Sequence, residues 1–207
     1  MQPQIVRASL STQIRDHLVR RIVSGSLRPG DRLVELRIAS ELNTSQAPVR
    51  EAMRELEAIG LVETRHNKGS RVRVISDPEM REIYDVRAEL EGYASELVAL
   101  SGKDLSEELN GEIEGMGAAA ERADSILFSE HNTNFHRCVL TGAGNATLLS
   151  LWQGLNVKMR TNLNVLRHRA DLLEVTESHR VLVDTLAAGD PVAARNAARS
   201  HVQRNRP

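Results

Sequence analysis

Apolar residues near the start of the chain recur at the spacing of a helix. Ile14, Leu18 and Ile22 stand four residues apart, so residues 11–24 are predicted to form a helix with one apolar face. Gly25 follows, and glycine is the residue that most readily ends a helix. A proline-glycine turn at residues 29–30 then separates this helix from the next apolar pattern.

Two further helices with a short break between them are predicted next. Apolar residues fall on one face of residues 36–42 and again on one face of residues 46–59. Residues 43–45, Asn-Thr-Ser, form the break, and the serine is a suitable N-cap for the second of these helices. Pro48 falls in the first turn of that helix, where a missing N–H costs nothing, and Gly60 ends it.

Two short strands are predicted after the third helix, over residues 61–64 and 71–74. Residues 66–69, His-Asn-Lys-Gly, join them as the tip of a hairpin. The order helix, helix, turn, helix, hairpin is the plan of a winged helix-turn-helix, which is predicted to occupy residues 1–75.

Beyond residue 75 the pattern is helical throughout. Residues 76–79, Ser-Asp-Pro-Glu, are typical both of a linker and of a helix start, and Asp190 before Pro191 is typical of an N-cap with proline at the first helical position. The predicted helices cover residues 79–100, 104–122, 125–141, 145–168, 171–188 and 191–204. The fold class is therefore mainly α, with an all-α helical bundle over residues 80–207.

Composition agrees with helices packed on helices, because aromatic residues make up only 2% of the 207 residues. The one cysteine, Cys138, excludes an intrachain disulfide and a zinc site built on cysteines. No apolar run approaches the roughly 18–20 residues of a membrane span, and residues 1–9 lack the apolar core of a signal peptide. We expect a cytoplasmic protein that does not contact a membrane.

Charge is distributed unevenly along the chain. Residues 1–75 carry 13 lysines and arginines against 8 acidic residues, whereas residues 76–207 carry 14 against 20. A basic first part beside an acidic second part indicates that the first part meets a polyanion.

The start of the predicted helix over residues 46–59 carries side chains suited to reading DNA. A recognition helix inserts its N-terminal end into the major groove, where Gln46 can pair with an adenine edge and Ala47 can approach a thymine methyl. Arg50 can reach guanine or phosphate, and Ser45 can donate to a phosphate while it caps the helix. The alternative is an ordinary amphipathic helix with a solvated basic face.

The tip of the predicted hairpin is the second candidate DNA contact. His66 and Lys68 are expected to lie against the adjacent groove or the phosphate backbone. A basic hairpin beside a helix-turn-helix favours DNA binding over the amphipathic-helix alternative. A symmetric pair of such units would bind palindromic DNA, so we expect a homodimer.

Residues 25–69 closely resemble the DNA-binding domain of GntR-family transcription regulators. The resemblance lies in LRPGDRL at residues 27–33, SQAPVREAM at residues 45–53 and LEAIGLV at residues 56–62. It implies a winged helix-turn-helix in which Ser45, Gln46, Ala47, Arg50 and His66 contact operator DNA. The chain has glutamine at position 46, where many members of the family have arginine.

Three of the seven histidines stand on three separate predicted helices. Asn132 and His136 are four residues apart and share one helix face, while His179 and His201 belong to two later helices. Helical bundles build metal sites from side chains that converge in this way, and imidazoles with an oxygen suit Zn²⁺, Ni²⁺, Mn²⁺ or Fe²⁺. The alternative is a set of surface or core histidines that bind no metal.

The remaining candidates fit no such pattern. His131 and His168 are expected at the surface, and Cys138 is expected to be a small core residue instead of a ligand.

Residues 80–207 resemble the FCD class of ligand-binding domain found in GntR regulators. The resemblance lies in YDVRAELE at residues 84–91, NTNFH at residues 132–136, and the segments around residues 178–191 and 199–202. In that class an Asp or Asn and three His bind a divalent metal, and a small carboxylate effector often completes the shell. The resemblance therefore implies Asn132, His136, His179 and His201 as metal ligands.

Two arginines are candidate effector-binding residues. Arg87 is suited to gripping a carboxylate beside a metal, and Arg160 is a weaker candidate of the same kind. The alternative for Arg87 is a helix-surface ion pair with Glu91, four residues later.

These observations predict a ligand-responsive transcription regulator, in this family more often a repressor, and not an enzyme. Its operator affinity would change when a small organic acid binds at the metal of the second domain. Two alternatives remain open: a constitutive DNA-binding protein whose metal is purely structural, and a metal-dependent hydrolase that uses open metal positions to activate water.

Overall fold

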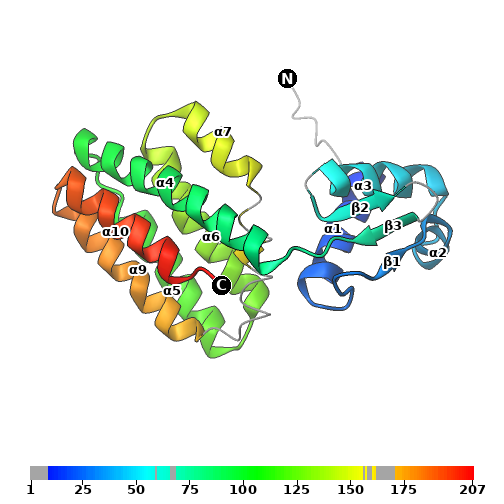
Figure 1. Ribbon diagram of the computed structural model, residues 1–207. Coiled ribbons are helices and arrows are strands. Elements are labelled where there is room, and N and C mark those ends of the chain that lie inside the picture. The colour runs from blue at the N-terminus through cyan, green and yellow to red at the C-terminus, as the bar shows by residue number, and fades with distance from the viewer. Residues whose placement is uncertain (1–8, 59, 66–68, 156, 158–159, 162–170) are drawn as a thin grey trace, which may run out of the picture. The chain divides into compact units, whose positions relative to one another are not determined.

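The computed structural model describes residues 9–58, 60–65, 69–155, 157, 160–161 and 171–207. The chain divides into two compact units, Met1–Ile75 and Ser76–Pro207, each with its own internal contacts. The first unit contains three helices and a small sheet, and the second is helical wherever the structure describes an element (Figure 1). The mainly α fold class is confirmed.

Three helices form the first unit as predicted: α1 (Leu10–Val23), α2 (Glu35–Glu41) and α3 (Gln46–Ala58). The apolar face of α1 is buried, with Ile14 and Leu18 3% and 0% exposed, and α1 packs against α3. Val49 and Leu56 of α3 are also fully buried. This packing leaves the opposite face of α3 to solvent.

The turn between α2 and α3 is held by backbone hydrogen bonds. Thr44 N donates to the Ala39 carbonyl at 2.9 Å, and Asn43 adopts a positive φ of 49°. Asparagine tolerates this left-handed conformation better than most residues, which explains its place in the predicted break.

A three-stranded antiparallel sheet completes the first unit, in the order β1-β3-β2. β2 (Val62–Arg65) and β3 (Gly69–Val72) pair with Val62 opposite Val72, within two residues of the predicted strands. β1 (Arg32–Leu33) was not predicted, because two residues show no alternation that could reveal a strand. Residues 66–68 of the predicted hairpin tip lie outside the described residues.

The second unit is a helical bundle. Its described helices are α4 (Asp77–Ser101), α5 (Ser106–Glu121), α6 (Ser125–Gly142), α7 (Ala146–Gly154), α9 (Leu172–Ala187) and α10 (Pro191–Arg204). Residues 76–79, expected as linker and helix start, are the N-cap and first turn of α4, because the Ser76 side chain accepts from Glu79 N. The single helix predicted over residues 145–168 is wrong in its extent, since α7 ends at Gly154 with Leu155 as its C-cap.

The bundle core is built by packing α4 against α10 and α5 against α6 and α9. Phe128 and Phe135 of α6 are fully buried, so both phenylalanines of the chain are used in this core. Local signals mark the helix ends. Asp190 caps α10 with Pro191 at the first position, as expected, and Gly102 ends α4 with a φ of 66°. Among the described residues, no helix is long and apolar enough to cross a membrane.

Candidate metal centre and DNA-reading face

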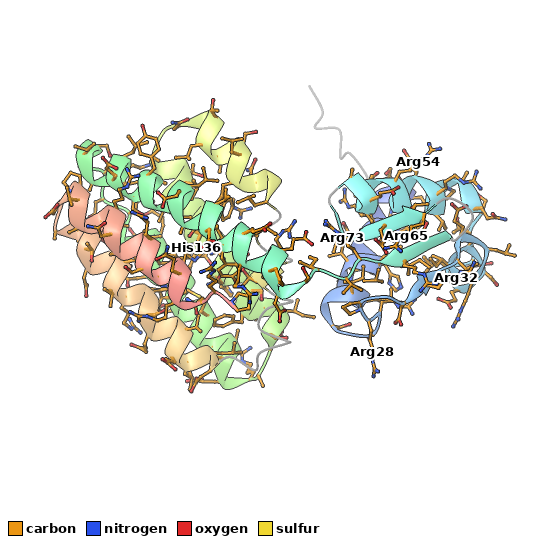
Figure 2. The ribbon with its side chains drawn as sticks, viewed as in Figure 1. Arg28, Arg32, Arg54, Arg65, Arg73 and His136 are labelled. Carbon is orange, nitrogen blue, oxygen red and sulfur yellow. The ribbon has the colours of Figure 1, made fainter. Side chains whose placement is uncertain are left out.

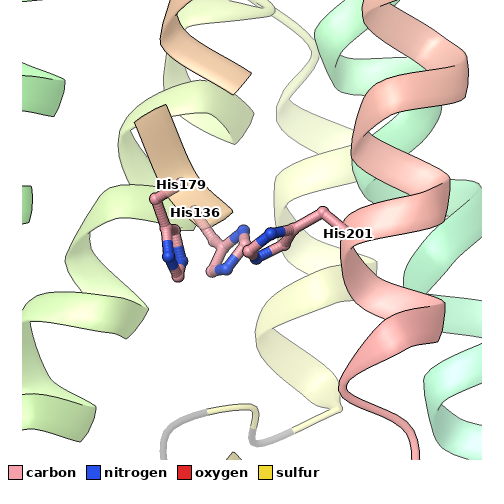
Figure 3. Close-up of side chains that lie close together, drawn as sticks. All are labelled: His136, His179 and His201. Carbon is pink, nitrogen blue, oxygen red and sulfur yellow. The ribbon is translucent and has the colours of Figure 1, made fainter. Parts of the chain in front are cut away.

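His136 of α6, His179 of α9 and His201 of α10 meet inside the helical bundle (Figure 3). Each offers a ring nitrogen, and the three nitrogens lie within 4.8 Å of one another. The rings of His179 and His201 are 4.2 Å apart between centroids, and His136 is 5.3 Å from both. The structure thus brings together the three histidines that the sequence placed on separate helices.

These imidazoles are shielded from solvent, with exposed fractions of 3% for His136, 0% for His179 and 6% for His201. Burial, with the neighbouring His136, lowers the pKa of His179 to about 3. Burial and the other two histidines also lower the pKa of His201 well below its usual value. Both rings are therefore uncharged at neutral pH, which is the form that binds a metal ion.

The Nδ1 atoms of His179 and His201 are held by a shared set of hydrogen bonds. His179 Nδ1 lies 2.8 Å from the Val175 carbonyl, which can only accept. Ser178 Oγ donates to the same carbonyl at 2.6 Å and lies 3.3 Å from His201 Nδ1, so it is left to accept from that ring. The rings of His179 and His201 therefore each carry their proton on Nδ1, and the Nε2 of each ring keeps its lone pair.

Glu91 of α4 lies buried against His136 and joins the cluster to two other elements. Its Oε1 accepts from Arg87 Nε at 2.6 Å and from Trp152 Nε1 of α7 at 2.7 Å, and its Oε2 lies 2.8 Å from His136 Nδ1. Burial raises the pKa of Glu91, but Arg87, His136 and the Trp152 N–H together lower it to about 2. The sequence indicated Glu91 only as a surface partner of Arg87, because nothing in the spacing revealed its burial.

The donor set fits a divalent cation. Asn132, 4% exposed, lies with Nδ2 3.0 Å from His179 Nε2. Within the part of the chain that the structure describes, buried Asn132 Oδ1 and His136 Nε2 have no hydrogen-bond partner. Unpaired buried acceptors cost about 1–3 kcal/mol each, and a bound cation would satisfy both. Nitrogen and oxygen ligands of this kind suit the first-row metals named from the sequence.

A cavity of about 30 Å³ adjoins the histidines. This space accommodates about two water molecules. Its described lining includes Tyr84, Arg87, Asn132, His136, Thr161, His201 and Asn205. Polar groups from α4, α6 and α10 therefore surround the open side of the cluster.

The two candidate effector-binding arginines have different positions. Arg87 pairs with Glu91 as its alternative interpretation predicted, but the pair is buried, with side chains 5% and 3% exposed, and Arg87 also lines the cavity. Arg160 donates from Nε to the Leu155 carbonyl at 2.6 Å and is not among the cavity's lining residues. Among the described lining residues of the cavity Arg87 is present and Arg160 is not, and an effector-binding role stays a prediction for both.

The other histidines and the cysteine lie apart from this cluster. His131 is half-buried, not at the surface as expected, and its Nδ1 lies 2.7 Å from Glu112 Oε2. Cys138 is partly buried, packs against the core, and has a pKa raised by that burial. His168 lies outside the described residues.

The N-terminal end of α3 presents polar and small side chains to solvent, while Val49 beneath them is fully buried. The exposed residues are Ser45, Gln46, Ala47 and Arg50. Arg50 Nη2 lies 2.9 Å from Glu35 Oε2 of α2, and the hydrogen bond and charge of Glu35 raise the pKa of Arg50. This exposure is what a recognition helix needs, whereas His66 and Lys68 lie outside the described residues.

Exposed arginines on the sheet are further candidate DNA contacts that the sequence patterns did not single out. Arg32 of β1 stands directly opposite Arg71 of β3, and both are exposed, as is Arg65 of β2. Figure 2 shows Arg32, Arg54 and Arg65 with the first unit. Like charges directly opposite each other destabilise a sheet, and a polyanion would relieve that repulsion. The pairing could not be foreseen because it depends on the two-residue strand β1.

Two families match the chain. Residues 10–72 match the bacterial regulatory proteins of the GntR family, and residues 82–204 match the FCD domain. The solved structure of McbR/YncC from Escherichia coli has a TM-score of 0.77 at 26% identity and covers 96% of both chains. A regulator from Rhodococcus has the same TM-score at 22% identity, with 95% of each chain covered, and supports the fold alone.

Curated relatives extend over most of the chain. A protein of Paenarthrobacter nicotinovorans described as the probable D-xylose utilization operon transcriptional repressor is 40% identical, covering 96% of this chain and 88% of its own length. The gluconate operon transcriptional repressor of Bacillus licheniformis is 28% identical over 86% of this chain and 73% of its own. These relatives are repressors and not enzymes. The chain therefore belongs to the GntR family of bacterial regulatory proteins, with a DNA-binding domain followed by an FCD domain.

Proposed function

We propose that the protein is a homodimeric repressor whose affinity for a palindromic operator changes when a small organic acid binds at a metal ion. The metal ion, Zn²⁺, Ni²⁺, Mn²⁺ or Fe²⁺, would be held by His136, His179, His201 and Asn132. The observation that carries the proposal is the meeting of three buried imidazoles. Among the described residues, His136 Nε2 in this triad and Asn132 Oδ1 beside it are buried acceptors without a hydrogen-bond partner. A metal bound there supplies a positive charge that attracts a carboxylate.

Arg87 supports an acidic effector. Its guanidinium lines the cavity beside the histidines and is suited to pair with a carboxylate. Two relatives are named for gluconate and D-xylose operons, which makes sugar-derived acids the first compounds to test. The metal ion and Arg87 would together bind the carboxylate of the effector from two sides.

The size of the cavity suggests how binding is coupled to the rest of the protein. A space of about 30 Å³, as the described residues line it, is too small for a molecule such as gluconate, so we expect lining side chains or helices to move before it can enter. Those helices include α4, whose first turn follows directly on the DNA-binding unit in sequence. The effector would thus shift the population of states that bind the operator.

An uncharged face on α4 and α7 supports a dimer with a second copy of this chain. Val86, Tyr93 and Leu100 of α4 are exposed and seven residues apart, so they share one helix face. The neighbouring helix α7 contains no charged residue, and its Leu151 is 59% exposed. Depletion of charge around exposed apolar groups is typical of interfaces, and two half-sites on DNA require two copies.

The test is operator binding titrated with gluconate and related acids, with and without Zn²⁺ or Ni²⁺. We expect metal-loaded wild-type protein to change its operator affinity by about 5- to 150-fold with the correct acid. His136→Ala should bind DNA without this response, and His131→Ala is the matched control that should retain it. Unchanged affinity with every acid, with the metal bound, would favour a constitutive DNA-binding protein whose metal is structural.

A further inference from the structure

We infer that Glu91 is a positioning residue that fixes the proton of His136 on Nδ1 and so keeps Nε2 available as a metal ligand. The inference rests on the metal centre proposed above and assigns a role to a residue outside its ligand set. It follows from how the two carboxylate oxygens of Glu91 are divided among their partners.

The first carboxylate oxygen is committed to two donors that cannot accept. Oε1 receives the Arg87 Nε–H at 2.6 Å and the Trp152 Nε1–H at 2.7 Å. Arginine and tryptophan side chains have no acceptor in these groups, so this side of residue 91 must present an oxygen. The orientation of the side chain is therefore held from α4 and from α7 at once.

The second carboxylate oxygen consequently determines which ring nitrogen of His136 carries the proton. Oε2 lies 2.8 Å from His136 Nδ1, at ion-pair distance, and has no hydrogen-bond partner among the described residues. A carboxylate oxygen can only accept, so a proton on Nδ1 is the one that would satisfy it. His136 Nε2 then keeps its lone pair and, among the described residues, has no hydrogen-bond partner. A carboxylate behind a metal-binding histidine also raises the basicity of the ligand nitrogen.

The other two histidines are held differently. The Nδ1 atoms of His179 and His201 face the Val175 carbonyl and Ser178 Oγ, which are neutral acceptors. His136 is thus the member of the triad whose partner carries a charge. Changing Glu91 should therefore alter one ligand of the three and leave the hydrogen bonds of the other two in place.

Glu91→Gln tests this role with almost no change in shape. Arg87 and Trp152 would still require an oxygen on their side, so the new amide would turn its NH₂ toward His136. Nδ1 would then have to accept and the proton would move to Nε2, the nitrogen needed by the metal. We expect the affinity for Zn²⁺, measured by competition with a chelator, to fall by about 10- to 100-fold.

Glu112→Gln is the matched control. Glu112 Oε2 lies 2.7 Å from His131 Nδ1, a hydrogen-bonded glutamate–histidine pair at a similar distance that is half-buried and outside the triad. The same chemical change there should leave Zn²⁺ affinity at the wild-type value. An equal loss in both variants, or no loss in folded Glu91→Gln protein, would overturn the inference.

A second measurement needs neither metal nor a substitution at Glu91. Imidazole ¹⁵N NMR of metal-free wild-type protein reports which nitrogen of His136 carries its proton, with His136→Gln used to assign the signal. We expect the proton on Nδ1, and a proton on Nε2 would overturn the inference even if Glu91→Gln fails to fold. If wild-type protein shows the Nδ1 tautomer but binds no Zn²⁺, Ni²⁺, Mn²⁺ or Fe²⁺, the proposed metal-dependent function fails while the role of Glu91 in orienting His136 stands.

Discussion

Arg50, the candidate DNA-contacting arginine of α3, already has a partner in the absence of DNA. Glu35 of α2 lies 2.9 Å away, and both side chains are partly or largely exposed to solvent. An operator would have to compete with this carboxylate for the guanidinium, and it would also be repelled by the carboxylate's charge. If Arg50 contacts DNA as predicted, Glu35 is expected to limit the affinity that Arg50 contributes.

Glu35→Gln is expected to tighten operator binding by roughly 2- to 5-fold, in line with the small value of exposed ion pairs. Electrophoretic mobility shifts at fixed salt would measure this change. Glu55→Gln is the matched control, because it removes the same charge from an ion pair with Arg15 farther along α3. If both variants tighten binding equally, net charge and not the release of Arg50 is responsible.

At the scale of elements, the positions of most helices could be predicted from the sequence, whereas the contacts between elements could not. Spacing of apolar residues located α1, α3 and α10 to within about two residues, because burial on one face imposes the helical period. The two-residue strand β1 and the end of α7 at Gly154 depend on contacts made across the fold, which leave no local period. Similarly, spacing and family resemblance indicated the three histidines, whereas the buried position of Glu91 required the packing of α4 against α6 and α7.

The exposed face of α4 and α7 leads to a prediction at this scale. Leu151→Glu should weaken the proposed dimer, because a charge placed within an apolar interface loses its hydration when two copies associate. Analytical ultracentrifugation should show a monomer fraction at concentrations where wild-type protein is dimeric. Leu173→Glu, at a residue of α9 that is 53% exposed, is the control that should leave the dimer intact. Dimers unaffected by Leu151→Glu would place the interface elsewhere.

At the scale of the whole molecule, the proposed metal ties together helices that are far apart in sequence. His136, His179 and His201 come from α6, α9 and α10, so one ion would link three helices of the bundle. A ligand that binds only the folded state stabilises it in proportion to the logarithm of its concentration. The metal should therefore act on the stability of the unit formed by residues 76–207.

Calorimetry tests this effect directly. At a Zn²⁺ concentration 100 times the Kd, we expect the unfolding free energy to rise by about 2.7 kcal/mol, with a higher Tm that a chelator reverses. His201→Ala should abolish the rise, and His17→Ala, in the other unit, should preserve it. A Tm that does not respond to any of the four metals would contradict binding at these histidines.

The indole of Trp152 gives the protein an internal optical reporter. It is the sole tryptophan of the chain, it is 2% exposed, and its N–H donates to the carboxylate that also faces His136. Indole emission responds to nearby charge, so a cation entering between the imidazoles or an anion drawing Arg87 aside should alter the emitted light. Candidate effectors could thus be screened on unlabelled protein, even before its operator has been identified.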